Sequence, residues 1–357
     1  MLLPSEKLLE LAQHRFKSAE KKRLYGKYIE NLSNKGLPVI LSFRHLADAL
    51  ELTPSELQGL TFSTHQYYRE FTVPKRSGGS RTISSPSPLL DKAQTWILNN
   101  ILNVVHENNP EGVIGYSRGR SILDHITPHA CSVQLVKFDL KDFFPSLGSE
   151  KIRTIFGKMG YSRSATNTLA SLSTLNDGLP QGARTSPALS NIHMRDFDFD
   201  MNFFCQENSL IYSRYVDDIV VSGDDIFALL PKIKTKFSDH SLNINHKKTR
   251  AYRHLDQVRF ITGLILHNGK IRLPKEMRRR IRVQCHLFLR DIDHFVSHGA
   301  SNMNLSPPIS WKEKETIFDP TFPDRLIGKL NYWLHIEPSN SYAINALATI
   351  KEKLSSI

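Results

Sequence analysis

Two adjacent aspartates, Asp217 and Asp218, interrupt a segment that otherwise reads as a pair of β-strands. The residues on both sides are apolar or β-branched, which favours strands joined by a tight turn within 210–223. Two neighbouring anions repel each other, and a turn of Asn-Gly type would avoid that cost. Either this is an ordinary acidic turn, or a divalent cation neutralises the pair.

A third carboxylate, Asp139, ends an apolar run that begins at Val133. We predict a strand there that stops before Pro145, so that carboxylates from two strand ends converge. Mg²⁺ takes oxygen ligands and is commonly shared between protein carboxylates and substrate phosphates. Two such ions about 4 Å apart stabilise both oxygens of an in-line phosphoryl displacement. The pattern therefore indicates nucleotidyl transfer at a two-metal magnesium site.

The sequence around these carboxylates resembles the motifs of reverse transcriptases. Tyr215-Val216-Asp217-Asp218 is similar to their Tyr-x-Asp-Asp box, and the segment from Asp139 is similar to their first catalytic strand. Between the two, residues 178–187 resemble the family's Leu-Pro-Gln-Gly loop. Each box alone is moderately specific, whereas the three in this order argue strongly against an ordinary acidic turn.

The resemblance implies a role for each of these positions. Asp139, Asp217 and Asp218 match the catalytic residues, and the same three with the backbone of Leu140 match the metal ligands. A basic Gly-Gly turn within 68–86 resembles the family's fingers hairpin. The positions that match contacts to the incoming deoxynucleotide are Lys75, Arg81, Phe144 and Gln181.

Phe144 corresponds to the bulky side chain that crowds a ribose 2′-hydroxyl and so favours deoxynucleotides. Without the resemblance, this aromatic would read as core and the basic turn as solvated surface. Arg81 offers a two-pronged contact to phosphate and Lys75 a point charge. An Asn-x-x-Lys-Thr box resembles that of the same family and places Lys247 or Lys248 near the active site.

Composition is consistent with a nucleic-acid enzyme. The formal net charge of +12 indicates a polyanionic partner, because Lys and Arg gain affinity through counterion release. Acidic lipid surfaces would satisfy the same charge. However, no window has the apolar length of a membrane span, and the first residues lack the apolar core of a secretory signal. We therefore expect a soluble cytoplasmic protein without a membrane partner.

The resemblance covers most of the chain and implies an α+β, right-hand polymerase architecture. Such a fold has fingers, a palm made of an antiparallel sheet plus helices, and a helical thumb. We divide the chain into a helical N-terminal extension at 1–60, fingers at 61–130, a palm with the catalytic site at 131–265, and an RNA-binding thumb at 266–357.

Several features are similar to the retron type of reverse transcriptase. The segment from Phe260 to Leu264 resembles the Val-Thr-Gly box of retron enzymes and precedes an amphipathic helix with a basic outer side. The chain ends soon after the thumb, so we expect no ribonuclease H or integrase region. In the segment 119–129, only His129 matches the retron Asn-Ala-x-x-His motif. The residues expected to bind RNA are Ile261, Thr262, Gly263, Arg278, Arg279 and Arg282.

A retron enzyme reverse transcribes part of a cognate structured non-coding RNA into single-stranded DNA, starting from a 2′-hydroxyl of a guanosine in that RNA. The partners implied are this RNA, its RNA–DNA product, deoxynucleotides and, in antiphage defence, an effector protein. Two alternatives remain: another bacterial defence-associated or group II intron-like reverse transcriptase, and a catalytically silent RNA-binding scaffold. The intact Asp139, Asp217 and Asp218 argue against the scaffold.

Overall fold

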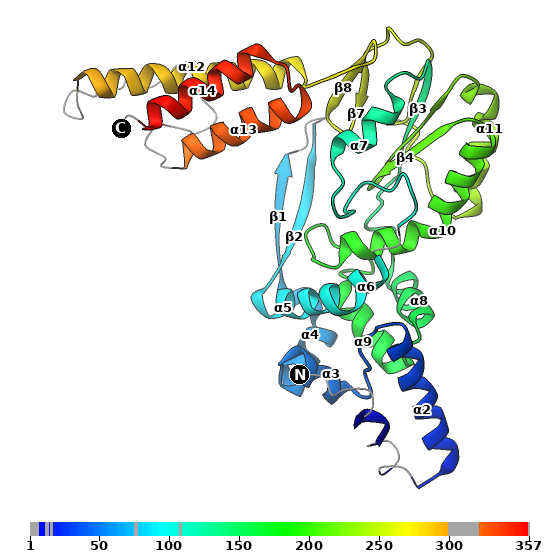
Figure 1. Ribbon diagram of the computed structural model, residues 1–357. Helices are drawn as coiled ribbons and strands as arrows, with labels where there is room; N and C mark the ends of the chain where they lie inside the picture. The colour runs from blue at the N-terminus through cyan, green and yellow to red at the C-terminus, as the bar shows by residue number, and fades with distance from the viewer. Residues whose placement is uncertain are drawn as a thin grey trace. The chain divides into compact units, whose positions relative to one another are not determined.

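The described residues form two compact units (Figure 1). One unit consists of Met1–His125 with Leu135–Ala251, and the other of Ile126–Gln134 with Tyr252–Ile357. In this computed structural model the described residues are 7–10, 14, 17–74, 78–106, 109–298 and 321–355, without the side chains of 294–298.

The first unit begins with helices whose starts are set by short polar side chains. In helices α2 (Ala19–Asn34), α3 (Phe43–Leu50) and α4 (Pro54–Phe62), the N-cap side chain accepts a hydrogen bond from a backbone N–H of the first turn. Thr53 and Glu56 form a reciprocal capping box on α4, with Pro54 at the first helical position.

An antiparallel hairpin of β1 (Tyr68–Pro74) and β2 (Ser80–Pro86) follows a short 3₁₀ turn at Thr64–Tyr67. Most side chains on both strands are exposed. The chain then runs through α5 (Pro88–Ile97), a π-helical turn at Leu98–Leu102 and α6 (Asn103–His106).

The core of the first unit is a four-stranded sheet in the order β4-β5-β3-β6. Helices α8 (Ser149–Met159) and α9 (Arg163–Ser173) lie between β3 and the long helix α10 in the chain. The strands are β3 (Gln134–Asp139), β4 (Ile211–Tyr215), β5 (Asp218–Gly223) and β6 (Arg250–Tyr252).

Helices α10 (Ser186–Glu207) and α11 (Ile226–Asp239) cover one face of this sheet. Phe237 of α11 packs with ring centroids 5.0 Å from both Phe138 of β3 and Phe197 of α10. The opposite face of β4 meets α7 (Ile122–Ile126), because neighbouring strand residues point to opposite faces. The antiparallel β4–β5 pair with packed helices confirms the predicted α+β class.

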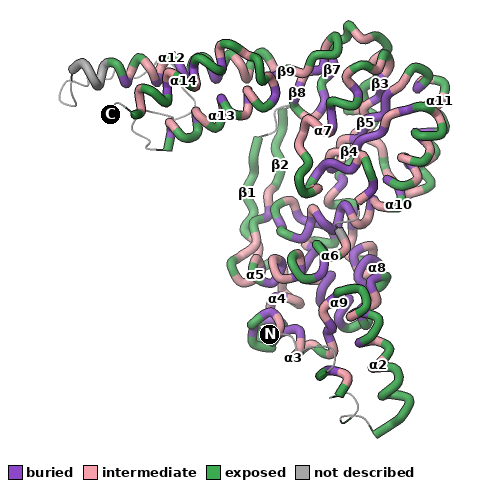
Figure 2. The backbone as a smooth tube through the Cα atoms, viewed as in Figure 1, coloured by how far each residue is buried: buried purple, intermediate pink, exposed green. Residues whose placement is uncertain are grey.

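In its described residues, the second unit combines a small sheet with three helices, after a 3₁₀ turn at Thr127–His129. The antiparallel strands β7 (Arg259–Ile261), β8 (Leu264–His267) and β9 (Lys270–Arg272) lead into the helices. Figure 2 shows buried positions along these helices. Trp333 and Phe322 are among the buried side chains. The helices are α12 (Lys275–His298), α13 (Phe322–Ile336) and α14 (Ser341–Ser355).

Candidate active site

The predicted hairpin is present, and its turn is strained. Tyr215 pairs with Asp218, so Val216 and Asp217 alone connect β4 to β5. Val216 has a φ of 62°, a left-handed conformation that a β-branched residue rarely adopts. Backbone strain of this kind costs about 1–3 kcal/mol and persists only where the surroundings enforce it. The structure around this turn therefore has to hold it in place.

The end of β3 lies directly beside this turn. The backbone N–H of Leu140 donates to the carbonyl of Asp217 at 3.2 Å. Burial raises the pKa of the Asp217 carboxyl to about 6, and the charges of Asp218 and Asp139 add to the shift. The three carboxylates predicted from two strand ends therefore lie close enough to repel one another.

Two lysines neutralise part of this negative charge. Lys137 lies two residues before Asp139 on β3, and its Nζ is 2.9 Å from the carboxylate of Asp218. The Nζ of Lys248 is 3.0 Å from the carboxylate of Asp139. Of the two lysines expected near the site, Lys248 makes this contact, whereas Lys137 was not predicted from the sequence.

The donor set suits a divalent cation, although its side chains are paired with lysines. Within the described ranges, no group of three or more His, Cys, Asp or Glu is arranged to hold a metal ion. Carboxylate oxygens are the ligands that Mg²⁺ prefers, and the mutual repulsion at Asp217 would be relieved by a cation. Metal binding by all three carboxylates would displace Lys137 and Lys248 from Asp218 and Asp139.

A buried ion pair between β4 and α10 supports the strained turn. Arg214 is fully buried, and its Nε and Nη2 donate to the two carboxylate oxygens of Asp198 on α10 at 2.7 and 2.6 Å. Its Nη1 donates to the carbonyl of Val216 at 3.0 Å. The hydroxyl of Tyr212 also donates to Asp198, at 2.5 Å. The guanidinium thus ties the turn to α10 through a network that water does not reach.

The segment before α7 packs closely against the same turn. A Cβ on Gly115 would lie 2.6 Å from the backbone nitrogen of Val216, so only glycine permits this approach. Asn191 of α10 donates to the carbonyl of Gly115 at 2.8 Å. On the other face of β4, the imidazole of His125 is 2.7 Å from the hydroxyl of Ser213.

None of these supporting residues was predicted from the sequence. The available signal was an arginine, Arg214, inside an apolar strand, because a charge at a buried position must be paired. Its partner, Asp198, lies on a different element, and the sequence alone does not identify the pairing.

Of the described residues expected to contact the nucleotide, one lies on β2 and two lie in loops. Arg81 is exposed on β2, and Phe144 is half-buried with its ring centroid 5.5 Å from that of the buried Phe143. The carbonyl of Gln181 accepts from the N–H of Ser84, at 2.8 Å, which joins the Leu-Pro-Gln-Gly loop to β2. Lys75 lies outside the described residues.

The residues expected to bind RNA lie in the second unit, and they differ in accessibility. Ile261 is fully buried, whereas Thr262 and Gly263 form the turn between β7 and β8, both with positive φ. On α12, Arg279 is exposed. The guanidinium of Arg282 lies over the rings of Tyr342 and Trp333, 4.8 and 5.7 Å from their centroids. Arg278 is half-buried.

Comparison with known proteins places the chain in a family. The model of the reverse transcriptase (RNA-dependent DNA polymerase) family matches residues 73–265, more than half of the chain. The chain is 33% identical over 260 residues to the Retron Ec86 reverse transcriptase of Escherichia coli, covering 71% of this chain and 80% of that protein. It is 30% identical over 298 residues to the Retron Mx162 reverse transcriptase of Myxococcus xanthus, covering 72% and 61%.

Among solved structures, apo telomerase from Candida tropicalis matches with a TM-score of 0.49 and 11% identity, covering 99% of this chain and 80% of that one. The family assignment does not depend on this weak likeness. The matched segment runs from the end of β1 through β2, the four-stranded sheet and β7 to the start of β8. The chain therefore belongs to the bacterial retron-type reverse transcriptases, which are RNA-directed DNA polymerases with a right-hand α+β fold.

Proposed function

We propose that this protein copies part of a cognate structured non-coding RNA into single-stranded DNA, in the cytoplasm. Synthesis starts from a 2′-hydroxyl of a guanosine in that RNA. The observation that carries the proposal is the convergence of Asp139, Asp217 and Asp218 at two adjoining strand ends, beside Lys248. The similarity to retron reverse transcriptases supports the choice of template and primer.

In this proposal the three carboxylates and the backbone oxygen of Leu140 hold two Mg²⁺ ions. The bound ions supply activation of the attacking hydroxyl and stabilisation of the charge on the leaving oxygen. The Arg214–Asp198 pair and Gly115 keep the turn in the conformation that aims the carboxylates.

We assign the incoming deoxynucleotide to the groups around this turn. Lys75 and Arg81 on the basic hairpin contact the triphosphate, and Gln181 lines the pocket. Phe144 crowds the position of a ribose 2′-hydroxyl. The support for this assignment is the bond between Ser84 and Gln181, which joins the hairpin strand β2 to the Leu-Pro-Gln-Gly loop.

In the same scheme residues 1–60 are a helical extension, 61–130 the fingers, 131–265 the palm and 266–357 the thumb. The turn at Thr262-Gly263 and the exposed side of α12 would grip the RNA, with Arg279 as the freest of the proposed arginines. Ile261 acts from the core, by holding this turn. Arg278 and Arg282 complete the proposed contact. In antiphage defence the complex would act beside an effector protein.

The nucleic acid that copurifies with the protein tests this proposal. We expect a DNA strand joined to a structured RNA through a 2′,5′-linkage, which a debranching enzyme cleaves and which an Asp218→Asn variant fails to make. Primer extension with Mg²⁺ on an annealed RNA template tests polymerisation separately. If the wild type extends primers but copurifies with no branched RNA–DNA molecule, the retron-type priming is wrong and polymerisation stands.

A further inference from the structure

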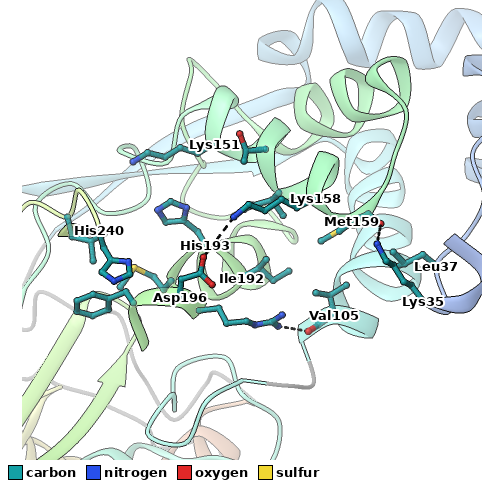
Figure 3. Close-up of a pocket in the computed structure, with 16 residues that line it drawn as sticks. Lys35, Leu37, Val105, Lys151, Lys158, Met159, Ile192, His193, Asp196 and His240 are labelled. Atoms are coloured by element: carbon teal, nitrogen blue, oxygen red, sulfur yellow. Dashed lines mark hydrogen bonds and ion pairs between the residues drawn. The ribbon is translucent and has the colours of Figure 1, made fainter. Parts of the chain in front are cut away.

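A cavity of about 530 Å³ lies in the first unit and contains none of the residues discussed so far as polymerase contacts. Its walls come from the residues that follow α2, from α6, α8 and α10, and from the residues that follow α11. In Figure 3, His240 lies at one end of the cavity and Lys35 at the other, with His193 between them. Cavities of this size commonly bind small ligands or single groups of larger ones.

The lining carries an excess of positive charge. Lys35 donates to the carbonyl of Met159 at 3.0 Å, and Lys151 donates to the carbonyl of Ser146 at 3.2 Å. Carbonyl groups carry no net charge, so these hydrogen bonds leave the lysine charges uncompensated. The permanent cations are Lys35, Lys151, Lys158 and Arg195, and the one carboxylate is Asp196. The cavity therefore favours an anionic ligand.

Apart from Thr154 and His240, the rest of the wall is apolar and includes the neutral imidazole of His193. Burial, with the charge of Lys151, lowers the pKa of His193 to about 4, so this ring is uncharged near neutral pH. A neutral imidazole has one hydrogen-bond donor, one acceptor and a flat face on which a base can stack. The apolar lining residues are Leu37, Val105, Ile155, Met159, Ile192, Met194, Phe197 and Leu242.

We propose that this cavity binds an unpaired nucleotide of single-stranded RNA, with its base against the apolar wall and His193 and its flanking phosphates on the lysines. The positive charge selects a polyanion, and the apolar wall selects a splayed-out base, which a duplex does not present. The carboxylate of Asp196, 3.9 Å from Lys158, accepts a hydrogen bond from the 2′-hydroxyl that DNA lacks. The site goes beyond the proposed polymerase function and rests on it only for the source of the RNA.

Photocrosslinking locates the bound RNA. The full chain is first saturated with a chain-terminated primer–template, then mixed with a single-stranded RNA oligonucleotide that carries 5-iodouridine, and irradiated. We expect crosslinked peptides from α8 and from the segment 192–197 of α10. Crosslinks that fall only elsewhere would overturn the proposal, as would displacement of the oligonucleotide by an acidic peptide.

Charge reversal tests the phosphate contacts. In the Lys151→Glu/Lys158→Glu variant we expect the affinity for the oligonucleotide to fall at least ~10-fold, with a shallower salt dependence, by about 1.4 in the log–log slope for two lost contacts. The matched control is Lys232→Glu/Lys234→Glu, which makes the same charge change at exposed positions of α11 in the same unit. Equal losses in both variants would show a general electrostatic effect and overturn the site.

The choice of RNA over DNA has its own test. We expect a DNA oligonucleotide of the same sequence to bind several-fold more weakly, and Asp196→Ala to remove that difference. Equal affinities in the wild type would overturn the RNA assignment. Extension of a generic primer–template should proceed at the wild-type rate in every variant. A wild type that extends no primer would refute the proposed polymerase function, while the crosslinks would still decide this site.

Discussion

Two β-hairpins of the first unit carry predicted site residues, and they are built in opposite ways. The β4–β5 hairpin is buried at most strand positions and exposed at none, and Arg214 ties its turn to α10. The β1–β2 hairpin is exposed on most positions, and Arg81 lies free on its surface. Carboxylates that hold a metal must be placed within a fraction of an ångström, whereas cations that follow a triphosphate need freedom to move. Burial thus separates the groups that must stay fixed from those that must adapt.

In the buried β4–β5 hairpin, we expect the largest effect on DNA synthesis from neutralising Asp217. Asp217→Asn should lower the rate of DNA synthesis by at least ~10³-fold, because the loss of a metal ligand removes several kcal/mol of transition-state stabilisation. The same change should raise the melting temperature in EDTA, since a buried anion that faces Asp139 and Asp218 becomes neutral. Single-turnover extension and thermal unfolding measure the two effects.

Asp218→Asn and Asp139→Asn should abolish synthesis in the same way. Asp224→Asn is the control, because Asp224 is exposed beyond the end of β5. Normal synthesis by any of the three variants with Mg²⁺ would contradict the assignment of the carboxylates.

Removing the buried Arg214–Asp198 pair tests whether burial holds the β4–β5 turn in place. Arg214→Lys keeps the charge but loses the two-pronged contact to Asp198 and the bond to Val216, so we expect a loss of about 3–5 kcal/mol in unfolding free energy. Synthesis should fall further than the folded fraction does. Lys236→Met breaks a partly exposed pair between α11 and Asp200 of α10, and should cost less than about 1 kcal/mol. Equal losses in denaturant titrations would remove the distinction between buried and exposed support.

Phe144 is half-buried, so its exposure lies between that of the β4–β5 hairpin and that of the β1–β2 hairpin. Phe144→Ala should reduce the preference for deoxynucleotides over ribonucleotides by roughly 10-fold or more, because the steric barrier against a 2′-hydroxyl is removed. The ratio of incorporation measures this. Phe143→Ala is the control, since Phe143 is buried in the core and should lose stability without a change in the ratio. An unchanged ratio in an active Phe144→Ala enzyme would make Phe144 a packing residue.

His125, on the face of β4 that meets α7, should make the stability of the protein depend on pH. Burial, with the charges of Lys137 and Arg214, lowers the pKa of His125 to about 3. The unfolded chain binds a proton at this residue below about pH 6.5 and the folded chain does not, so stability is lost as the pH falls from 6.5 towards 3. The loss approaches about 1.4 kcal/mol per pH unit. In His125→Gln, whose side chain does not titrate, unfolding free energies between pH 6.5 and 5 should fall less steeply, and an unchanged slope would exclude His125 as the cause.

The exposed hairpin should give the smallest change and no loss of stability. Arg81→Ala should raise the KM for deoxynucleotides about 10-fold, which corresponds to ~1.4 kcal/mol of lost binding. Its melting temperature should stay that of the wild type, because the side chain is exposed. Arg69→Ala, at an exposed position of β1, should change neither quantity. A large fall in melting temperature for Arg81→Ala would mean that this hairpin, too, is fixed by its contacts.

Much of the β4–β5 hairpin was predictable because its signals are local. Alternation of apolar residues around Asp217 and Asp218 predicts strands and a turn, and the order of three motifs predicts the family. The structure and the comparisons confirm both. The basic turn before Arg81 was equally visible, since two β-prone runs flank it.

The supporting residues were not predictable, because their roles depend on partners far away in the chain. Arg214 reads as an odd residue in a strand until α10 brings Asp198 to it. Lys137 reads as an exposed position on an alternating strand until β5 places Asp218 beside it. The cavity proposed to bind RNA has no sequence motif of its own, since its lining comes from five separate segments.

The sequence by itself determined the strands, the turn with its adjacent carboxylates, and the family, because each follows from neighbouring residues and short motifs. Only the tertiary structure decided which cations pair with those carboxylates and which residues hold the turn in its left-handed conformation. The physical reason is that burial and charge pairing are properties of segments brought together by folding. A lysine or arginine is either solvated or paired with a carboxylate, depending on which segment packs against it. That segment can lie about a hundred residues away in the sequence.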